Sequence, residues 1–351
     1  MAPALDNDGC FSEAGTGWRG EGRTDMSDIA ATLLSAPILF FILGVLAAAA
    51  RSDLAVPETV AKGLSLYLMA AIGLKGGVEV AKAGIHSSLI LALLAGLLLS
   101  ALIPFFVAPV LRRFGKLDGV NAGAVAAHYG SVSVVTFVTA QQVYGNTGFV
   151  VAGFMVAVLA LMETPAIISG LLLARRYSAA EFSGGADGID KELLREVLFN
   201  GSVVLLLGSF AIGLMIGEEG FEPVAPLFRS GFTGVLCLFL LDMGLIAMRR
   251  LRDTRALTAR LVALGIAFPL VNGTLGAFVG TMIGLEPASA AALAVLAASA
   301  SYIAVPAAMR MALPQANAGL YLAMSLGVTF PFNILFGIPL YRFLAETMGG
   351  L

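Results

Sequence analysis

The chain has 351 residues, of which 58% are hydrophobic and 13% charged, with a net charge of −2 and a mean hydropathy of +0.91. Soluble domains carry about 25% charged residues, so this composition excludes a soluble protein and predicts an integral membrane protein. The basic residues are scattered in short clusters between apolar runs, which excludes nucleic acid as a partner.

Residues 1–32 are polar and lack an apolar core, which predicts an N-terminal tail that is neither a signal peptide nor a folded unit. Either Met1 or Met26 could be the natural start. The later apolar runs are each long enough to cross a hydrocarbon layer of about 30 Å as a helix. We predict ten spans in an all-α membrane fold, at 33–50, 58–78, 86–111, 119–141, 147–175, 195–217, 227–249, 257–283, 288–311 and 317–345.

Lysine and arginine divide unequally between the two sides of these spans, with 15 on one side and 6 on the other. The richer side is predicted to be cytoplasmic, which places both termini outside. The most basic loop, from Met248 to Arg260, lies on the cytoplasmic side. Its charge fixes the orientation, and a lipid or partner site is the alternative.

Matching motifs in the two halves indicate an internal repeat. The pairs are Leu117-Asp118 with Leu285-Glu286, Gly73-Leu74 with Gly244-Leu245, and Thr164-Pro165 with Phe330-Pro331, at offsets of 168, 171 and 166 residues. Each repeat holds five spans, and since five is odd the second copy enters from the opposite face, which is inverted-repeat topology. The predicted units are a first repeat at 33–176, a polar cytoplasmic linker at 177–194 and a second repeat at 195–347.

The fourth and ninth spans are both predicted to be broken helices. The fourth contains Tyr129-Gly130-Ser131-Val132-Ser133 and the ninth contains Ser299-Ala300-Ser301 before Pro306, which are poor sequences for an unbroken helix. Backbone groups freed at the bilayer midplane must line a cavity or be buried in protein. Two weakened segments at corresponding places in two halves are typical of the binding site of a secondary transporter.

Polar groups near these breaks suit two kinds of ion. A half-helix N-terminus favours an anion, whereas helix C-termini and hydroxyl oxygens favour a sodium ion. The groups on offer are Gly130, Ser131, Ser133, Thr136 and Thr139 in the first repeat and Ser299, Ser301 and Tyr302 in the second. They predict a compact pocket for a small hydrated anion, although small residues could instead serve only close helix packing.

Ionisable or polar residues inside other spans are further candidates. Glu163 before Thr164-Pro165 and Asn333 after Pro331 lie at nearly matching places, and each proline frees a carbonyl one turn earlier. The predicted sodium-binding residues are therefore Thr136, Thr139, Glu163, Ser299 and Asn333. Glu163 could instead be purely structural.

Three other residues have open interpretations. Asp242 could form an ion pair with Lys75 or take part in coupling. His128 could titrate near neutral pH, but the preferred interpretation places it on the wall of a hydrated vestibule.

The sequence favours a transporter over an enzyme. An intramembrane aspartyl protease needs two aspartates at membrane depth, where only Asp242 qualifies, and no Gly-x-Ser-Gly or phosphate-binding Gly-x-x-x-x-Gly-Lys-Ser/Thr motif occurs. Two cysteines and two histidines argue against a zinc, haem or disulfide framework. We therefore predict that the protein uses no cofactor. If it pumps at all, we predict that an ion gradient supplies the energy, with sodium as the coupling ion.

Three stretches carry a family resemblance, namely 127–142 (AHYGSVSVVTFVTAQQ), 239–251 (FLLDMGLIAMRRL) and the long run 296–341. With them the chain, from about Leu33 to Thr347, resembles the sodium-dependent bicarbonate transporters of the SbtA type. The resemblance implies a trimer in the lipid of the bacterial inner membrane, with a gate domain (spans one, two, six and seven), a core domain and elevator-like motion. It also implies co-transport of sodium and bicarbonate, the anion lying near Gly130, Ser131, Val132, Ser133, Ala300, Ser301 and Tyr302.

Two departures from the family pattern leave alternatives open. The linker is shorter than in cyanobacterial members, on whose cytoplasmic face a PII-like regulatory protein docks, so that partner is a weaker expectation. His128 stands where a smaller or uncharged residue is expected, which admits another small anion or carboxylate as cargo. From a different class, the protein could be a membrane sensor or scaffold that signals through its basic loops.

Overall fold

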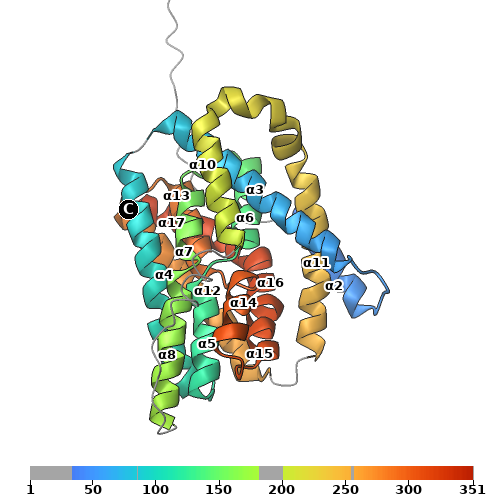
Figure 1. Ribbon diagram of the computed structural model, residues 1–351, viewed down its shortest axis with the longest axis vertical. Helices are drawn as coiled ribbons and strands as arrows, with labels where there is room; N and C mark the ends of the chain where they lie inside the picture. Colours follow the sequence, from blue (N-terminus) through green and yellow to red (C-terminus); the bar gives the residue numbers. More distant parts are fainter. Residues whose placement is uncertain (1–33, 85, 182–200, 254–256, 351) are drawn as a thin grey trace, which may run out of the picture.

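The computed structural model describes residues 34–84, 86–181, 201–253 and 257–350, and within these ranges every regular element is helical (Figure 1). Eight helical segments of the described chain are long and apolar enough to cross a membrane, and some of them, such as Gly119–Asn146 and Met155–Tyr177, join two consecutive helices. Two shorter apolar helices, Ala36–Ala49 and Pro287–Ala298, occupy the first and ninth predicted spans. The all-α membrane class is thus confirmed. The predicted tail at 1–32 and the linker beyond residue 181 lie outside the described residues.

The first half of the chain contains seven described helices. They are α2 (Ala36–Ala49), α3 (Glu58–Ala83), α4 (Ser87–Arg113), α5 (Gly119–Gly130), α6 (Val134–Asn146), α7 (Met155–Met162) and α8 (Pro165–Glu181). The Asp118 carboxylate caps the start of α5 by accepting a hydrogen bond of 2.8 Å from the Asn121 N–H. At the other end of this half, α8 continues to Glu181, into the stretch that the sequence predicted as linker.

The second half is divided into more elements, several of them short or irregular. Its elements are α10 (Gly201–Phe221), η1 (Glu222–Val224), η2 (Pro226–Ser230), α11 (Phe232–Asp253), α12 (Ala259–Met282), α13 (Pro287–Ala298), α14 (Ala304–Ala312), α15 (Ala318–Leu322), η3 (Ala323–Thr329), α16 (Phe330–Phe332), η4 (Asn333–Gly337) and α17 (Ile338–Gly349). The run from Ala318 to Gly349 is continuous, but η3 and η4 are π-helical. Such turns widen a helix locally and often mark functional positions.

Two helix pairs, α2 with α11 and α3 with α10, pack backbone to backbone (Figure 1). A Cβ at Gly44 or Gly244 would collide with a main-chain carbonyl across the α2–α11 contact. A Cβ at Gly77 or Gly213 would do the same across the α3–α10 contact. Small residues permit this close approach, which supplies van der Waals contact where lipid offers no hydrophobic drive.

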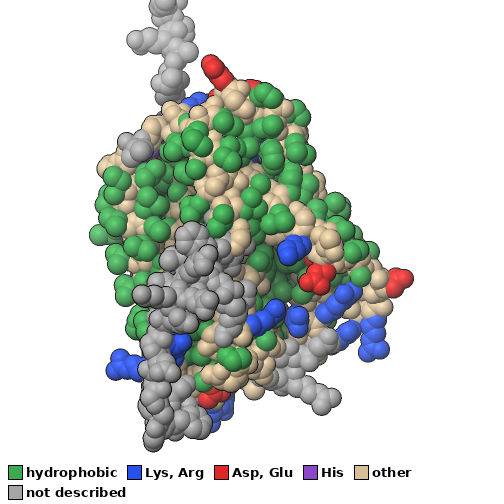
Figure 2. Space-filling view, in the orientation of Figure 1, with side chains coloured by type: hydrophobic (Ala, Val, Ile, Leu, Met, Phe, Trp, Pro, Cys, Tyr) green, Lys and Arg blue, Asp and Glu red, His purple; other side chains and the backbone are tan. Residues whose placement is uncertain are grey.

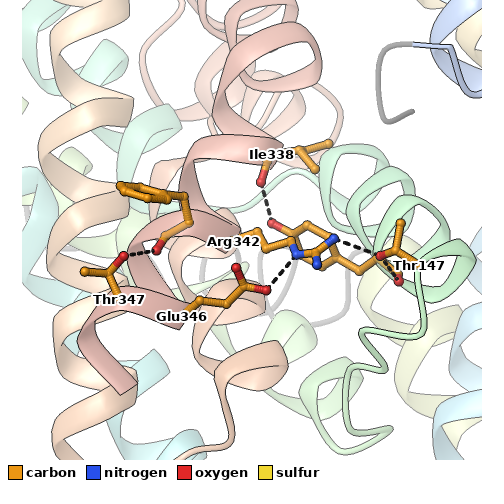
Figure 3. Close-up of polar contacts among 7 residues, drawn as sticks. Thr147, Ile338, Arg342, Glu346 and Thr347 are labelled. Carbon is orange, nitrogen blue, oxygen red and sulfur yellow. Dashed lines mark hydrogen bonds and ion pairs between the residues drawn. The ribbon is translucent and has the colours of Figure 1, made fainter. Parts of the chain in front are cut away.

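The helices α5, α6 and α13 form the interior of the remaining bundle, and almost every residue of α5 and α13 is buried. On the side where α6 ends, contacts join the two halves of the chain (Figure 3). The Arg342 guanidinium on α17 lies 2.9 Å from the Thr147 hydroxyl and 2.8 Å from the Glu346 carboxylate. Nearby, the buried Tyr144 hydroxyl donates to the Ile338 carbonyl at 2.7 Å.

The outer surface has the polarity of a membrane protein. Hydrophobic side chains are spread over the upper part of the face shown in Figure 2, whereas most of the lysine and arginine side chains in that view lie in its lower half. Along α4, for example, Leu94, Leu98 and Leu102 are each more than half exposed. This apolar belt faces lipid, and the basic end is the one that the charge count predicts to be cytoplasmic.

Candidate functional site

Both predicted weak points interrupt a helix in the structure. α5 ends at Gly130, Ser131 is extended with φ −84° and ψ 174°, and α6 begins at Val134. α13 ends at Ala298, Ser299 is extended with φ −77° and ψ 162°, and α14 begins at Ala304. The last helical residues of α5 and α13 are thus 168 positions apart, the offset of one of the sequence motifs.

The two interruptions are joined by hydrogen bonds that cross between the halves of the chain. The Ser133 N–H donates to the Ser299 Oγ at 2.8 Å. In the other direction, the Ser301 N–H donates to the His128 carbonyl at 2.8 Å. Each interruption therefore supplies the acceptor for a backbone N–H group of the other interruption. Backbone groups that are buried in an apolar interior need such partners.

A small cavity, the crossing cavity, lies between the interruptions. Its volume is about 10 Å³, about the space that one water molecule needs. The lining residues are Met69, Val132, Ser133, Val134, Glu163, Ser301, Tyr302, Ile303 and Ala304. Because this wall contains the first residues of both α6 and α14, two helix N-termini with partial positive charge adjoin the same space.

Two polar atoms in the wall of this cavity, the Glu163 Oε2 and the Tyr302 hydroxyl, have no hydrogen-bond partner among the described residues. Both residues are buried, Glu163 at 3% and Tyr302 at 8% exposure. An unsatisfied buried polar group costs about 1–3 kcal/mol. A water molecule or a bound solute that hydrogen bonds to both would remove that cost.

The hydroxyl groups around the cavity form a short network. The Ser133 Oγ accepts hydrogen bonds from the Thr136 N–H at 3.2 Å and from the Thr136 hydroxyl at 3.0 Å. The Ser131 hydroxyl donates to the main-chain carbonyl of Glu163 at 3.0 Å. Since the Ser133 oxygen already accepts twice, its own proton remains available to an acceptor in the cavity.

The structure brings Val132, Ser133, Glu163, Ser301 and Tyr302 to the cavity wall and places other predicted residues behind it. Ser131, Thr136 and Ser299 contact the wall residues through the hydrogen bonds above. Gly130 packs against Pro104 and Ala166, the Thr139 hydroxyl donates to the Val135 carbonyl at 2.8 Å, and the Asn333 amide donates to the Ala298 carbonyl at 3.0 Å. Ala300 is buried and brings no polar side chain.

Two interpretations drawn from the sequence are wrong. His128 does not line a hydrated vestibule: it is 0% exposed, its ring stacks on Tyr321 with 4.4 Å between centroids, and its Nδ1 lies 2.7 Å from the Ala124 carbonyl. Lys75 does not pair with Asp242. Its ammonium lies 4.5 Å from the centroid of the Phe232 ring instead.

The sequence reasoning missed several residues at the site. Ile303 precedes α14 and Ala304 is its first residue, so the rule that located the break could have included them. Met69 of α3 closes the cavity from another helix pair, and no sequence signal marked it. Ser100 of α4 donates to the Met162 carbonyl at 2.7 Å and accepts from the Ala166 N–H at 3.2 Å, so it satisfies the α7–α8 interruption beside Glu163.

The oxygen-rich chemistry of the site suits a hard monovalent cation better than a transition metal. Among the described residues, no group of three or more histidine, cysteine, aspartate or glutamate side chains could hold a metal ion. Hydroxyl, carboxylate and main-chain carbonyl oxygens do converge at the interruptions, and hard cations prefer oxygen ligands.

Comparisons with known proteins agree with this chemistry. A family model described as the Na+-dependent bicarbonate transporter superfamily matches residues 36–346. A comparison with curated proteins finds no match.

Proposed function

The chain belongs to the Na+-dependent bicarbonate transporter superfamily, as its resemblance predicted, and we propose that it imports bicarbonate together with sodium by secondary active transport. The family is one of transporters and not an enzyme class. Together with the apolar helices, this membership makes the chain a multi-pass membrane protein.

The proposed anion site is the crossing cavity, where the interrupted helices α5–α6 and α13–α14 are the broken helices of the transporter. One observation carries this assignment: the first turns of α6 and α14 adjoin the same buried space. Free N–H groups at helix N-termini bind anions, and the Ser133 and Ser301 hydroxyls add donors. The remaining substrate residues of this proposal are Gly130, Ser131, Val132, Ala300 and Tyr302.

The described conformation is closed around the proposed site. The crossing cavity has room for about one water molecule, and bicarbonate is larger than water. Binding therefore requires the wall to move, and Met69 is the wall residue from α3, outside the bundle that holds the interruptions. This need for opening supports a transport cycle in which the α2, α3, α10 and α11 pairs act as the gate.

Sodium is proposed to bind beside the anion. Glu163 supplies an unsatisfied carboxylate oxygen, and Thr136 and Ser299 supply hydroxyls that contact Ser133. Thr139 and Asn333 complete the proposed set one layer further out, where their polar atoms bond to main-chain carbonyls. A cation between a carboxylate and the anion would offset the charge repulsion between the two.

The finer architecture also belongs to this proposal. Ten spans in two inverted repeats of five fit the 168-residue separation of the two helix interruptions. Elevator-like motion fits the tight glycine contacts within α2–α11 and α3–α10, which favour movement of whole pairs. The resemblance alone supports the homotrimer, the bacterial inner membrane and a PII-like partner, and the charge count supports external termini.

Uptake of labelled bicarbonate into proteoliposomes tests the proposal. At alkaline pH, where little carbon dioxide forms, an inward sodium gradient should drive accumulation and an equal potassium gradient should not. Uptake that is absent or independent of sodium would refute the proposal. Competition by small carboxylates in the same vesicles tests the other-anion alternative, and Ser301→Ala, which a sensor or scaffold would tolerate, should abolish uptake.

A further inference from the structure

A second and larger cavity, the vestibule, lies between α3, α6, the segment before α7 and the chain that joins α10 to α11. Its volume is about 370 Å³. Lining residues include Ile72, Lys75, Gln141, Val150, Arg229 and Phe232. Val150 is 70% exposed, so the vestibule opens to the molecular surface on that side.

The vestibule and the crossing cavity share the same helices. In α3, Met69 lines the crossing cavity and Lys75 lines the vestibule. In α6, Val134 lines the crossing cavity and Gln141 lines the vestibule. With a rise of about 1.5 Å per helical residue, the two residues of each pair lie about 9–10 Å apart along their helix. The vestibule therefore lies about two helical turns from the proposed anion site, toward the end where α6 finishes.

The end of the molecule on which the vestibule opens is the one opposite the basic surface. α4 runs from Ser87 to Arg113, and its last turn carries Arg112 and Arg113 at the end predicted to be cytoplasmic. The chain then returns through α5 and α6, so the C-terminal end of α6 faces the other way. The vestibule is thus on the predicted outer side, from which an imported anion arrives.

The charge in the vestibule is dominated by one lysine. Arg229 is held by two carboxylates, at 2.7 Å from Glu218 and 3.2 Å from Glu222. Within the described part of the chain, no carboxylate lies within ion-pair distance of the Lys75 ammonium, which is placed over the Phe232 ring. Glu79 also lines the vestibule, but its side chain is exposed, so water screens its charge more than that of half-buried Lys75.

We propose that the vestibule is the outer entrance to the anion site and that Lys75 captures the incoming bicarbonate before the gate opens. This inference rests on the proposed function and names a residue of the access route. An unpaired ammonium in a cleft with low-dielectric walls concentrates anions locally and speeds their association. Because the ring of Phe232 holds the ammonium without neutralising its charge, the charge stays available to a passing anion.

The test measures initial rates of bicarbonate uptake against external bicarbonate in proteoliposomes that contain the full chain. Lys75→Met keeps the apolar stem and removes the charge, and Lys75→Arg restores a cation. Lys82→Met is the matched control, because Lys82 lies on the same helix near the same membrane face but outside the vestibule wall. We expect Lys75→Met to raise KM about threefold to tenfold with little change in the maximal rate. Lys75→Arg and Lys82→Met should stay within about twofold of the unaltered protein.

Ionic strength gives a second readout that a packing role for Lys75 would not change. The KM of the unaltered protein should rise with added inert salt, and that of Lys75→Met should respond much less. Cysteine chemistry gives a third. In a chain that has Cys10 and Cys237 replaced by alanine, Lys75→Cys should regain a low KM when a thiol reagent added outside attaches an aminoethyl group.

The outcomes separate this inference from the proposed function. Sodium-driven uptake with an unchanged KM in Lys75→Met, or an equal rise in Lys82→Met, would overturn the role of Lys75 alone. Failure of the aminoethyl reagent to modify Lys75→Cys would refute the claim that the vestibule is open to the outer side, even if Lys75→Met fails to fold. Absence of uptake by the unaltered protein would instead refute the proposed function.

Discussion

The hydrogen bond between the Ser133 N–H and the Ser299 hydroxyl makes a quantitative prediction for Ser299→Ala. The Ser299 Oγ accepts from the Ser133 N–H at 2.8 Å and donates to the Leu296 carbonyl at 2.9 Å. The alanine variant removes both bonds, but Leu296 keeps a partner, because its carbonyl also accepts from the N–H of residue 299 at 3.2 Å. The loss therefore falls on the Ser133 N–H, which is left buried without an acceptor.

The cost of that orphaned N–H sets the size of the effect. An unsatisfied buried donor costs about 1–3 kcal/mol, and hydrogen bonds inside membrane proteins average about 0.6 kcal/mol. We expect Ser299→Ala to lower the free energy of unfolding by about 1–2 kcal/mol. The same loss loosens the first turn of α6 at the proposed anion site, and about 1.4 kcal/mol corresponds to a tenfold change in rate or affinity.

Two measurements check this prediction. Thermal stability in detergent should fall by a few degrees, and sodium-driven bicarbonate uptake should fall about tenfold. The matched control is Ser289→Ala, since Ser289 lies on α13, the helix that ends just before Ser299, is also buried and accepts only a longer bond of 3.3 Å from the Ala152 N–H. If Ser299→Ala matches Ser289→Ala in both assays, the bond between the two interruptions contributes nothing and the reasoning fails.

Two further predictions concern the carboxylate and the helix pairs. Glu163→Gln retains the shape of the side chain but removes its charge, so the sodium concentration for half-maximal uptake should rise about tenfold or more; an unaltered sodium dependence would exclude Glu163 as a ligand. Gly77→Ala places a methyl group against the Phe210 carbonyl, which should cost about 1–3 kcal/mol and reduce the yield of folded protein. Gly63→Ala on the same helix meets open space, and equal behaviour of the two variants in size-exclusion chromatography would contradict the close α3–α10 contact.

The sequence located the helix interruptions because their cause is local. Glycine, serine and β-branched residues weaken a helix wherever they cluster, so the breaks at Ser131–Ser133 and after Ala298 could be predicted without knowledge of the fold. At Pro165 the sequence predicted only a carbonyl freed one turn earlier, whereas the structure interrupts the span fully, because α7 ends at Met162 and α8 begins at Pro165. Capping also acts locally, as at Asp118.

Features that depend on packing partners far along the chain could not be predicted. His128 is buried because Tyr321, in the other half, covers its ring. The sequence admitted an ion pair between Lys75 and Asp242, but the contact that places Lys75 over Phe232, far along the chain, has no signal in the sequence. The π-helical turns of η3 and η4 likewise arise inside an apolar run whose composition favours an ordinary α-helix.

The hydrogen bonds between the interruptions have a consequence for biogenesis. During synthesis, α5 and α6 reach the bilayer well before the segment that contains Ser299 and Ser301 has been translated. Until then the Ser133 N–H and the His128 carbonyl lack their final partners, and unsatisfied groups in hydrocarbon cost several kcal/mol each. The hydrogen bonding of the first half is therefore completed only when the chain from α13 to α14 has been inserted beside it.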